Sequence, residues 1–248
     1  MSTQRIQDGI ENINIKPSSF LMAGQSNMAG RGDFGEVAEI RNPLCYMLRM
    51  GRWQPMSEPI NPDRAVFGIR FHSGISPAAS FADCYTKEFG LPVGLIPCAD
   101  GGAGIAEWLP GELLFEHAVM QCNLAKKTSD IKGILWHQGE SDCKNISDFN
   151  AYENRLIEVI NALRKEIGDK NLPVLIGEIS YEISQSWKME SRNIEFNKRL
   201  PEIIRKIPNS VIVSSKGLAL KSDGIHFTSK SCREFGERYF KAYLHLTK

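Results

Sequence analysis

The sequence lacks any long uninterrupted apolar run. No stretch of its 248 residues approaches the roughly 20 apolar residues that a membrane-spanning helix requires. The first residues, 1–8, also lack the apolar core of a secretory signal peptide. We therefore expect no membrane partner and predict a cytoplasmic location.

The chain also lacks an excess of charge of either sign. Lysine and arginine together number 30, aspartate and glutamate 29, and the formal net charge is +1. A nucleic-acid-binding surface needs a basic patch, and no block of like charge supplies one. The six cysteines are scattered without a Cys-x-x-Cys pair, which argues against a zinc or redox site. We expect reduced thiols, no nucleic-acid partner, no cofactor and no bound metal.

Short apolar runs alternate with amphipathic segments along most of the chain. The runs predict five strands, at residues 20–23, 92–97, 131–136, 174–179 and 211–213. Helices are predicted at 76–89, 113–127, 148–167, 194–207 and 229–246, with Pro201 expected to kink or divide the fourth. Residues 25–73 are rich in Gly, Pro and Arg and are predicted as loops with a hairpin around 46–53. The alternation predicts one α/β domain over residues 1–248, with a parallel sheet covered by helices on both faces.

A serine near one end of the chain and a histidine near the other suggest nucleophilic catalysis. Ser26 directly follows the first predicted strand, and Asp223 lies three residues before His226 with Gly224 between them. A serine nucleophile needs a base to take its proton, and the base needs an acid to orient it. Ser26, His226 and Asp223 are therefore candidates for these three roles. The Gly-x-Ser-x-Gly elbow of the α/β-hydrolases is not present.

Glycines and polar residues follow two further predicted strands. Gly101 and Gly102 come after the second strand, and Gln138 comes after the third. Ligands of open parallel sheets bind at the carboxyl ends of the strands, so we expect these residues to lie near Ser26. A backbone N–H beside a glycine, or the Gln138 amide, can donate to the oxyanion of acyl transfer.

Four sequence blocks, in this order, resemble those of the SGNH-hydrolase superfamily. They are GQSNMAGRG from Gly24, the GG-x-x-I-x-x-W run from Gly101 to Trp108, WHQGESD from Trp136, and DGIHFT from Asp223. More narrowly, they resemble the sialic-acid O-acetylesterase-like group, which includes the family 6 carbohydrate esterases (acetyl xylan esterases). The blocks extend from about residue 20 to residue 230.

The resemblance implies a three-layer, flavodoxin-like α/β fold with a five-stranded parallel sheet of order 2-1-3-4-5. It implies Ser26 as nucleophile, His226 as base and Asp223 as acid, with Glu140 as a second candidate acid. The oxyanion hole would comprise the N–H groups of Ser26 and Gly102 and the Gln138 amide.

Three further residues in these blocks are expected to bind substrate: Gln25, Asn27 and Trp108. Arg31 is a candidate for contact with substrate, although a surface ion pair is the preferred interpretation. Ala103 replaces the threonine that often follows the paired glycines in the family, so the contacts there are left open. The implied activity is removal of O-acetyl groups from carbohydrates of the xylo-oligosaccharide or sialic-acid type, through an acetyl-serine intermediate.

Two other functions remain open at this stage. A metal-dependent hydrolase would use His137, Glu140, Asp142, Asp223 and His226 as ligands. A carbohydrate-binding protein without catalytic activity could also use this fold, because a fold alone does not determine function. The sequence leaves open the oligomeric state, the acetylated sugar and its hydroxyl, and the tolerance for longer acyl chains. It also leaves open the choice between Asp223 and Glu140 as acid, and between Gly101 and Gly102 as oxyanion donor.

Overall fold

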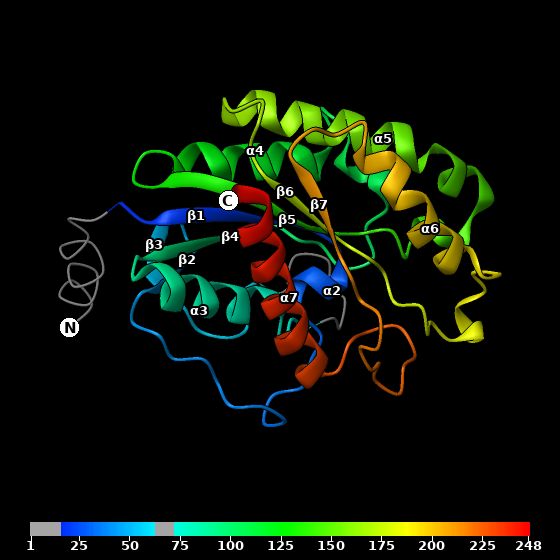
Figure 1. The fold of residues 1–248 in the computed structure, drawn as a ribbon, viewed down its shortest axis with the longest axis horizontal. Coiled ribbons are helices and arrows are strands. Elements are labelled where there is room, and N and C mark those ends of the chain that lie inside the picture. The colour runs from blue at the N-terminus through cyan, green and yellow to red at the C-terminus, as the bar shows by residue number, and fades with distance from the viewer. Residues whose placement is uncertain (1–15, 63–71) are drawn as a thin grey trace.

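A seven-stranded sheet forms the centre of the computed structural model, which describes residues 16–62 and 72–248. The strand order is β3-β2-β4-β1-β5-β6-β7 (Figure 1). The expectation of a five-stranded sheet is therefore wrong in the number of strands. The signal-peptide prediction for residues 1–8 lies outside the described residues, as do residues 63–71 of the predicted loop region.

Five parallel strands carry the predicted topology. They are β1 (Ser18–Gly24), β4 (Val93–Pro97), β5 (Asp130–His137), β6 (Val174–Gly177) and β7 (Ser210–Val213). Their spatial order, β4-β1-β5-β6-β7, is the expected 2-1-3-4-5 when only these five are counted. This arrangement places the carboxyl ends of all five strands at one edge of the sheet.

The two additional strands come from the hairpin in the predicted loop region. Strand β2 (Cys45–Arg49) pairs parallel to β4, and β3 (Arg52–Pro55) pairs antiparallel to β2. The Trp53 ring occupies the space that a side chain at Gly94 would need, and its indole N–H donates to the hydroxyl of Thr128 at 3.1 Å. These contacts attach the hairpin to the sheet. The sequence predicted the hairpin but not its pairing with the sheet, because its local pattern contains arginines.

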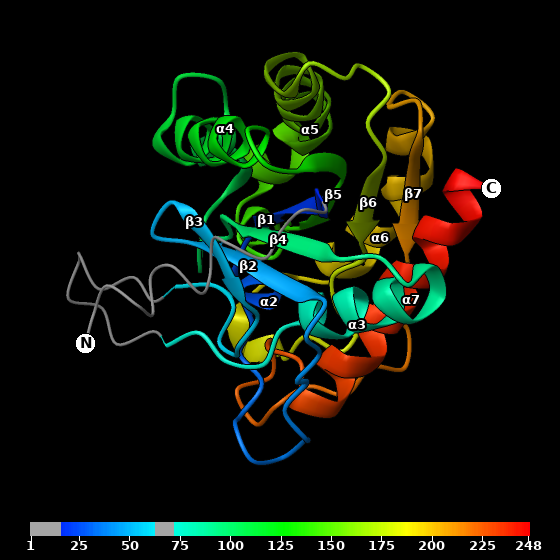
Figure 2. The same ribbon diagram turned by 90° about the vertical axis from the view of Figure 1, so that its left-hand side faces the viewer.

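Helices cover both faces of the sheet (Figures 1 and 2). One face carries α4 (Leu113–Ala125), α5 (Ile146–Ile167) and α6 (Arg192–Ile204), and the other carries α3 (Pro77–Phe89) and α7 (Ser229–Thr247). Helix α6 continues through Pro201 and is not divided there. Among the described residues, no helix combines the length and the apolar character needed to cross a membrane.

Strand β1 shows why the sheet needs both helical layers. Its side chains alternate between the two faces, so that Phe20 and Met22 pack with α3 and α7, while Leu21 and Ala23 pack with α4 and α5. All four residues are fully buried. A strand that is apolar on both faces must lie in the middle of a three-layer structure.

Side-chain caps fix the starts of the two helices, α3 and α7, that begin near the carboxyl ends of the strands. The Ser76 hydroxyl accepts a hydrogen bond from the Ala78 N–H at the start of α3. The Thr228 hydroxyl accepts from the Ser231 N–H at the start of α7. Since Thr228 is two residues from His226, the cap determines where the histidine loop ends and the helix begins.

Candidate active site

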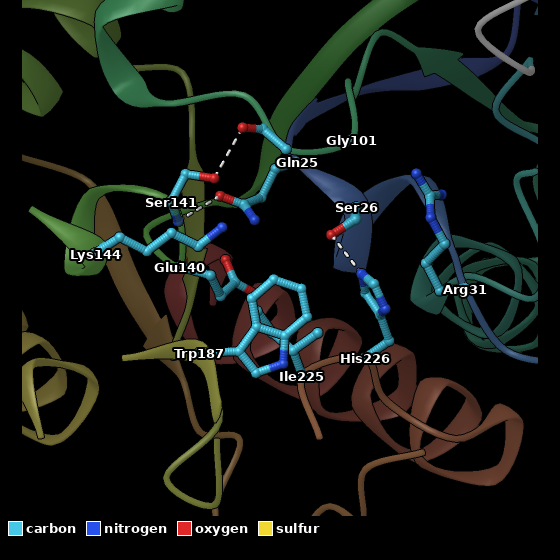
Figure 3. A pocket seen from close by; sticks show the side chains of 11 residues that line it. Gln25, Ser26, Arg31, Gly101, Glu140, Ser141, Lys144, Trp187, Ile225 and His226 are labelled. Atoms are coloured by element: carbon cyan, nitrogen blue, oxygen red, sulfur yellow. Dashed lines mark hydrogen bonds between the residues drawn. The ribbon is translucent and has the colours of Figure 1, made fainter. Parts of the chain in front are cut away.

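A pocket of about 150 Å³ lies at the carboxyl edge of the sheet (Figure 3). Residues from the loops after β1, β4, β5, β6 and β7 line it. They are Gln25, Ser26, Arg31, Gly101, Gly102, Glu140, Ser141, Lys144, Trp187, Ile225 and His226. Segments that are far apart in the sequence thus meet at the edge where an open parallel sheet binds its ligands.

Ser26, His226 and Asp223 form a continuous chain of hydrogen bonds. The Ser26 Oγ lies 3.0 Å from Nε2 of His226, and Nδ1 of His226 lies 2.8 Å from Oδ2 of Asp223. Because a carboxylate only accepts, Nδ1 carries the proton, and Nε2 is left to accept from the serine hydroxyl. This is the tautomer that a general base requires.

The Asp223 carboxylate is held by the loop that contains the histidine. Its Oδ1 accepts from the backbone N–H groups of Ile225 and His226, both at 3.0 Å. Partial burial raises the pKa of the Asp223 carboxyl, but the hydrogen bonds from the His226 backbone, the His226 ring and the Ile225 backbone outweigh it. The pKa therefore lies below its ordinary value. Asp223 is thus ionised at neutral pH and can orient His226.

The first turn after β1 supplies the nucleophile. Ser26 opens the short helix α2 (Ser26–Ala29), so its backbone N–H has no acceptor inside the helix. Ser26 is only 6% exposed and is reached through the pocket.

The two glycines after β4 meet different requirements of the pocket. A side chain at Gly101 would collide with the Arg31 guanidinium, so the absence of a Cβ makes room for that group. Gly102 has φ +82°, a left-handed backbone conformation that residues other than glycine rarely adopt. Both line the pocket beside Ser26, as their positions after β4 predicted.

Glu140, the second candidate acid, belongs to a separate buried group. Its Oε1 accepts from Nδ2 of Asn27 at 2.7 Å and lies 3.1 Å from Nε2 of His137. Burial raises the pKa of the Glu140 carboxyl, but the charge and hydrogen bond of His137, with the Asn27 bond, bring it below its ordinary value. The acid that contacts His226 in the structure is Asp223.

Asn27 links the serine turn to the histidine loop instead of facing substrate. Besides Glu140, its Nδ2 donates to the Ile225 carbonyl at 3.2 Å, and its Oδ1 accepts from the Phe227 N–H at 3.1 Å. The residue is 2% exposed and is not part of the pocket lining. The predicted substrate contact is corrected accordingly: Asn27 holds the backbone on both sides of His226.

Gln138 is also placed differently from the expectation. Its side-chain N–H groups donate to the Asp142 carboxylate and, at 3.1 Å, to the Ala103 carbonyl. It is fully buried and does not line the pocket. The amide is therefore engaged inside the protein, and the expectation that it points at the oxyanion is not met by this structure.

A different tryptophan forms the wall of the pocket. Trp108, the predicted substrate contact, is fully buried and packs edge-to-face on Trp136, with ring centroids 5.3 Å apart. Trp187, in the short helix η4 (Gln185–Trp187) after β6, lines the pocket and donates its indole N–H to the Asp223 carbonyl at 2.9 Å. Trp187 follows the end of a predicted strand, and this position could have indicated that it lies at the pocket.

Two basic residues also line the pocket: Arg31, for which a surface ion pair was preferred over a substrate contact, and Lys144, which the sequence analysis did not single out. Arg31 lies on the Gly101 side of Ser26, where it donates to the Gly30 carbonyl at 2.6 Å, so it is not confined to the surface (Figure 3). Lys144 places its ammonium 4.8 Å from the centroid of the Trp187 ring on the opposite side of the pocket.

The five residues of the metal alternative do not form one cluster. Asp223 and His226 are hydrogen-bonded to each other, whereas His137 and Glu140 form a pair of their own, and Asp142 binds Gln138. Within residues 16–62 and 72–248, no group of three or more His, Cys, Asp or Glu side chains is arranged to hold a metal ion. The donor arrangement thus gives the metal alternative no support.

Comparison with known proteins identifies relatives over nearly the whole chain. A protein of Arabidopsis thaliana named "Probable carbohydrate esterase At4g34215" is 30% identical over 246 residues, covering 91% of this chain and 89% of the relative. The crystal structure of the Arabidopsis protein superposes with a TM-score of 0.80, covering 93% of this chain and 99% of that one.

More distant structures share the fold. NanS is 16% identical with a TM-score of 0.72, covering 93% of this chain and 98% of that one. XAC1771, a carbohydrate acetylesterase from Xanthomonas citri, is 19% identical with a TM-score of 0.56, covering 92% of this chain and 56% of that one. The family model described as carbohydrate esterase, sialic acid-specific acetylesterase matches residues 16–245. The chain therefore belongs to this family of SGNH-type carbohydrate esterases.

Proposed function

We propose that the protein is a serine esterase that removes O-acetyl groups from acetylated carbohydrates through an acetyl-serine intermediate. The observation that carries the proposal is the hydrogen-bonded chain from Ser26 through His226 to Asp223 at the mouth of a pocket. Carbohydrates of the xylo-oligosaccharide or sialic-acid type are the proposed substrates.

The reaction would begin with attack of Ser26 on the acetyl carbonyl. His226 takes the serine proton at Nε2 while Asp223 stabilises the imidazolium through Nδ1. The carbonyl oxygen becomes an oxyanion, for which the backbone N–H groups of Ser26 and Gly102 are the proposed donors. Collapse of the tetrahedral intermediate breaks the bond to the sugar oxygen, which receives the proton from His226. Water activated by His226 then releases acetate and restores Ser26.

The size of the pocket favours a short acyl group. A cavity of about 150 Å³ holds a molecule the size of benzene, so an acetyl group and the first atoms of the alcohol fit inside it. The rest of the sugar would lie towards Trp187, whose half-buried ring can pack against the apolar face of a pyranose.

Acetate release from p-nitrophenyl acetate by wild type and Ser26→Ala, measured in EDTA, tests the proposal. We expect turnover by the wild type and loss of turnover in Ser26→Ala. Ser19→Ala is the matched control, because Ser19 is a buried serine of β1, the strand that leads to Ser26, and its hydroxyl contacts Ser129 away from the pocket. Equal turnover by wild type and Ser26→Ala would refute the nucleophile. Activity that EDTA abolishes and a divalent metal restores would instead support a metal-dependent enzyme.

Acetylated sugars test the proposed substrate class. Acetate release from acetylated xylo-oligosaccharides and from O-acetylated sialic acid should require Ser26 and be lost in Ser26→Ala. A wild type that cleaves p-nitrophenyl acetate but binds these sugars without releasing acetate would contradict the proposed class.

A further inference from the structure

We propose that Trp187 is a positioning residue for Asp223: its indole N–H holds the backbone of the acid in the place from which the carboxylate orients His226. The bond runs from the indole to the Asp223 carbonyl at 2.9 Å, and it comes from a loop that follows a different strand. The proposal rests on the proposed function, because the position of Asp223 affects turnover only if His226 is the base for Ser26.

The hydrogen bonds inside the turn that carries Asp223 and His226 do not attach this turn to the rest of the protein. The Asp223 carboxylate accepts from the backbone N–H groups of Ile225 and His226, which belong to the same turn. Asp223 is itself exposed, so close packing does not hold it in place. Asn27 holds the opposite end of the turn, at the Ile225 carbonyl and the Phe227 N–H. The Asp223 end therefore depends on contacts from another element.

The loop between β6 and α6 supplies these contacts. The Ser184 N–H donates to the Gly224 carbonyl at 2.8 Å, beside the bond from Trp187 to Asp223. Gly224 has φ +70°, and a Cβ at this position would lie 2.5 Å from the Cβ of Ser184. Because glycine has no Cβ, the two loops can approach this closely. Two consecutive carbonyls of the turn are thus held by one segment.

The segment that carries Trp187 is anchored in turn to the loop after β5. The Arg192 guanidinium donates to the carbonyls of Cys143 at 2.6 Å and Lys144 at 3.0 Å. It also donates to the carbonyl of Lys188, the residue after Trp187, at 3.4 Å. On the pocket side, the Lys144 ammonium lies 4.8 Å from the centroid of the Trp187 ring (Figure 3). The indole is therefore held in place by protein contacts before any substrate binds.

The backbone next to Trp187 is strained, which also indicates a segment with a specific task. Lys188, Glu190 and Ser191 have φ values of +55°, +50° and +64°, in the left-handed region that residues other than glycine seldom adopt. Such conformations cost free energy and persist only where surrounding contacts impose them, often at functional sites. The Arg192 contacts supply that constraint here, and the result is a fixed direction for the indole N–H.

A ring that only packs against substrate is the alternative role for Trp187. Trp187→Phe separates the two roles, because phenylalanine keeps an aromatic ring in the pocket wall but has no N–H to donate. A residue that orients the acid contributes to the transition state, so its loss lowers kcat and leaves KM little changed. A residue that only binds substrate would change KM instead.

The first experiment measures kcat and KM of wild type, Trp187→Phe and Trp53→Phe with p-nitrophenyl acetate. We expect Trp187→Phe to lower kcat by about threefold to tenfold, the range that follows from the loss of one hydrogen bond. Trp53→Phe is the matched control, because it removes an indole N–H that donates to Thr128 in the hairpin, away from the pocket lining. Its kcat should equal that of the wild type. An unchanged kcat in Trp187→Phe, a change confined to KM, or equal losses in both variants would overturn the inference.

A double variant tests whether the effect passes through Asp223. In Asp223→Ala no carboxylate remains for Trp187 to position, so adding Trp187→Phe should not lower the residual kcat any further. Ser26→Ala supplies the background rate for this comparison. A further loss of about threefold or more in the double variant would show that Trp187 acts elsewhere, and would also overturn the inference. If the wild type is inactive or Ser26→Ala is active, the proposed function fails instead, so the two failures are distinguishable.

Discussion

Asp142 provides the sharpest quantitative prediction, because its carboxyl group is buried beside the pocket. The residue is 3% exposed, and its carboxylate accepts from Gln138 and from the Ile105 N–H, whose distances to the two oxygens are 3.2 and 3.1 Å. Burial is the largest effect and raises the pKa from 3.8 to about 6, against these hydrogen bonds. The folded state therefore binds a proton more tightly than the unfolded state.

The sign of the effect follows from this difference. The stability contributed by protonated Asp142 is fully present below pH 3.8 and is lost as the pH rises through 6. At about 1.4 kcal/mol per unit of difference between the folded and unfolded pKa, protonation of Asp142 contributes at most about 3 kcal/mol to the free energy of unfolding. Between pH 4.5 and 7.5, the same linkage amounts to about 2 kcal/mol.

Urea unfolding of wild type and Asp142→Asn at pH 4.5, 6.0 and 7.5 measures this effect. Asparagine has no proton to lose, so the free energy of unfolding of the variant should rise relative to the wild type by about 2 kcal/mol across this range. Asp169→Asn, at an exposed turn, controls for the loss of one negative charge. A difference that does not change with pH, or that changes in the opposite direction, would refute the burial argument for Asp142.

Three further predictions concern the site and the residues that support it. Asp223→Asn should lower kcat by about 10⁴-fold, because the wrong tautomer of His226 is then favoured. A stopped esterase assay with p-nitrophenyl acetate measures kcat, and a loss below tenfold would argue against Asp223 as the orienting acid. Asn27→Ala should reduce the free energy of unfolding by about 3 kcal/mol, since the buried Glu140 carboxylate loses its 2.7 Å donor. Urea unfolding measures this loss, and an unaltered urea midpoint would contradict the linking role of Asn27. p-Nitrophenyl octanoate should have a kcat/KM about tenfold or more below that of the acetate ester, because the 150 Å³ pocket cannot enclose the longer chain. Equal kcat/KM values for the two esters would show that the acyl group lies outside this pocket.

Much of the site follows from where the predicted strands end. Ser26 after β1, the glycines after β4, and the Asp223–His226 loop after β7 all reach the pocket. Parallel strands bring their carboxyl ends together whatever the details of side-chain packing, so positions near strand ends can be located from local sequence.

The orientation of individual side chains could not be predicted in this way. Gln25 and Gln138 are chemically identical and both follow a strand, yet only Gln25 lines the pocket. The difference comes from the Asp142 carboxylate and the Ala103 carbonyl, which engage the Gln138 amide and become its neighbours only in the folded protein.

The sequence predicted a hairpin around residues 46–53, but its pairing with the central sheet could not be predicted, for a similar reason. The runs at Cys45–Arg49 and Arg52–Pro55 are short and carry arginines, so their local pattern does not indicate a sheet. They join it because Trp53 fits over Gly94, a residue some 40 positions away, and tertiary contact outweighs local preference.

The hydrogen bond between Ser26 and His226 joins residues 200 positions apart, and this has a consequence for how activity is acquired during folding. Closing so long a loop is entropically costly until the intervening sheet and helices have formed. During synthesis the nucleophile emerges early, whereas its base emerges only with the segment that leads into α7. Esterase activity in a refolding experiment would therefore report the arrival of the C-terminal segment, and partly folded chains would remain chemically inert.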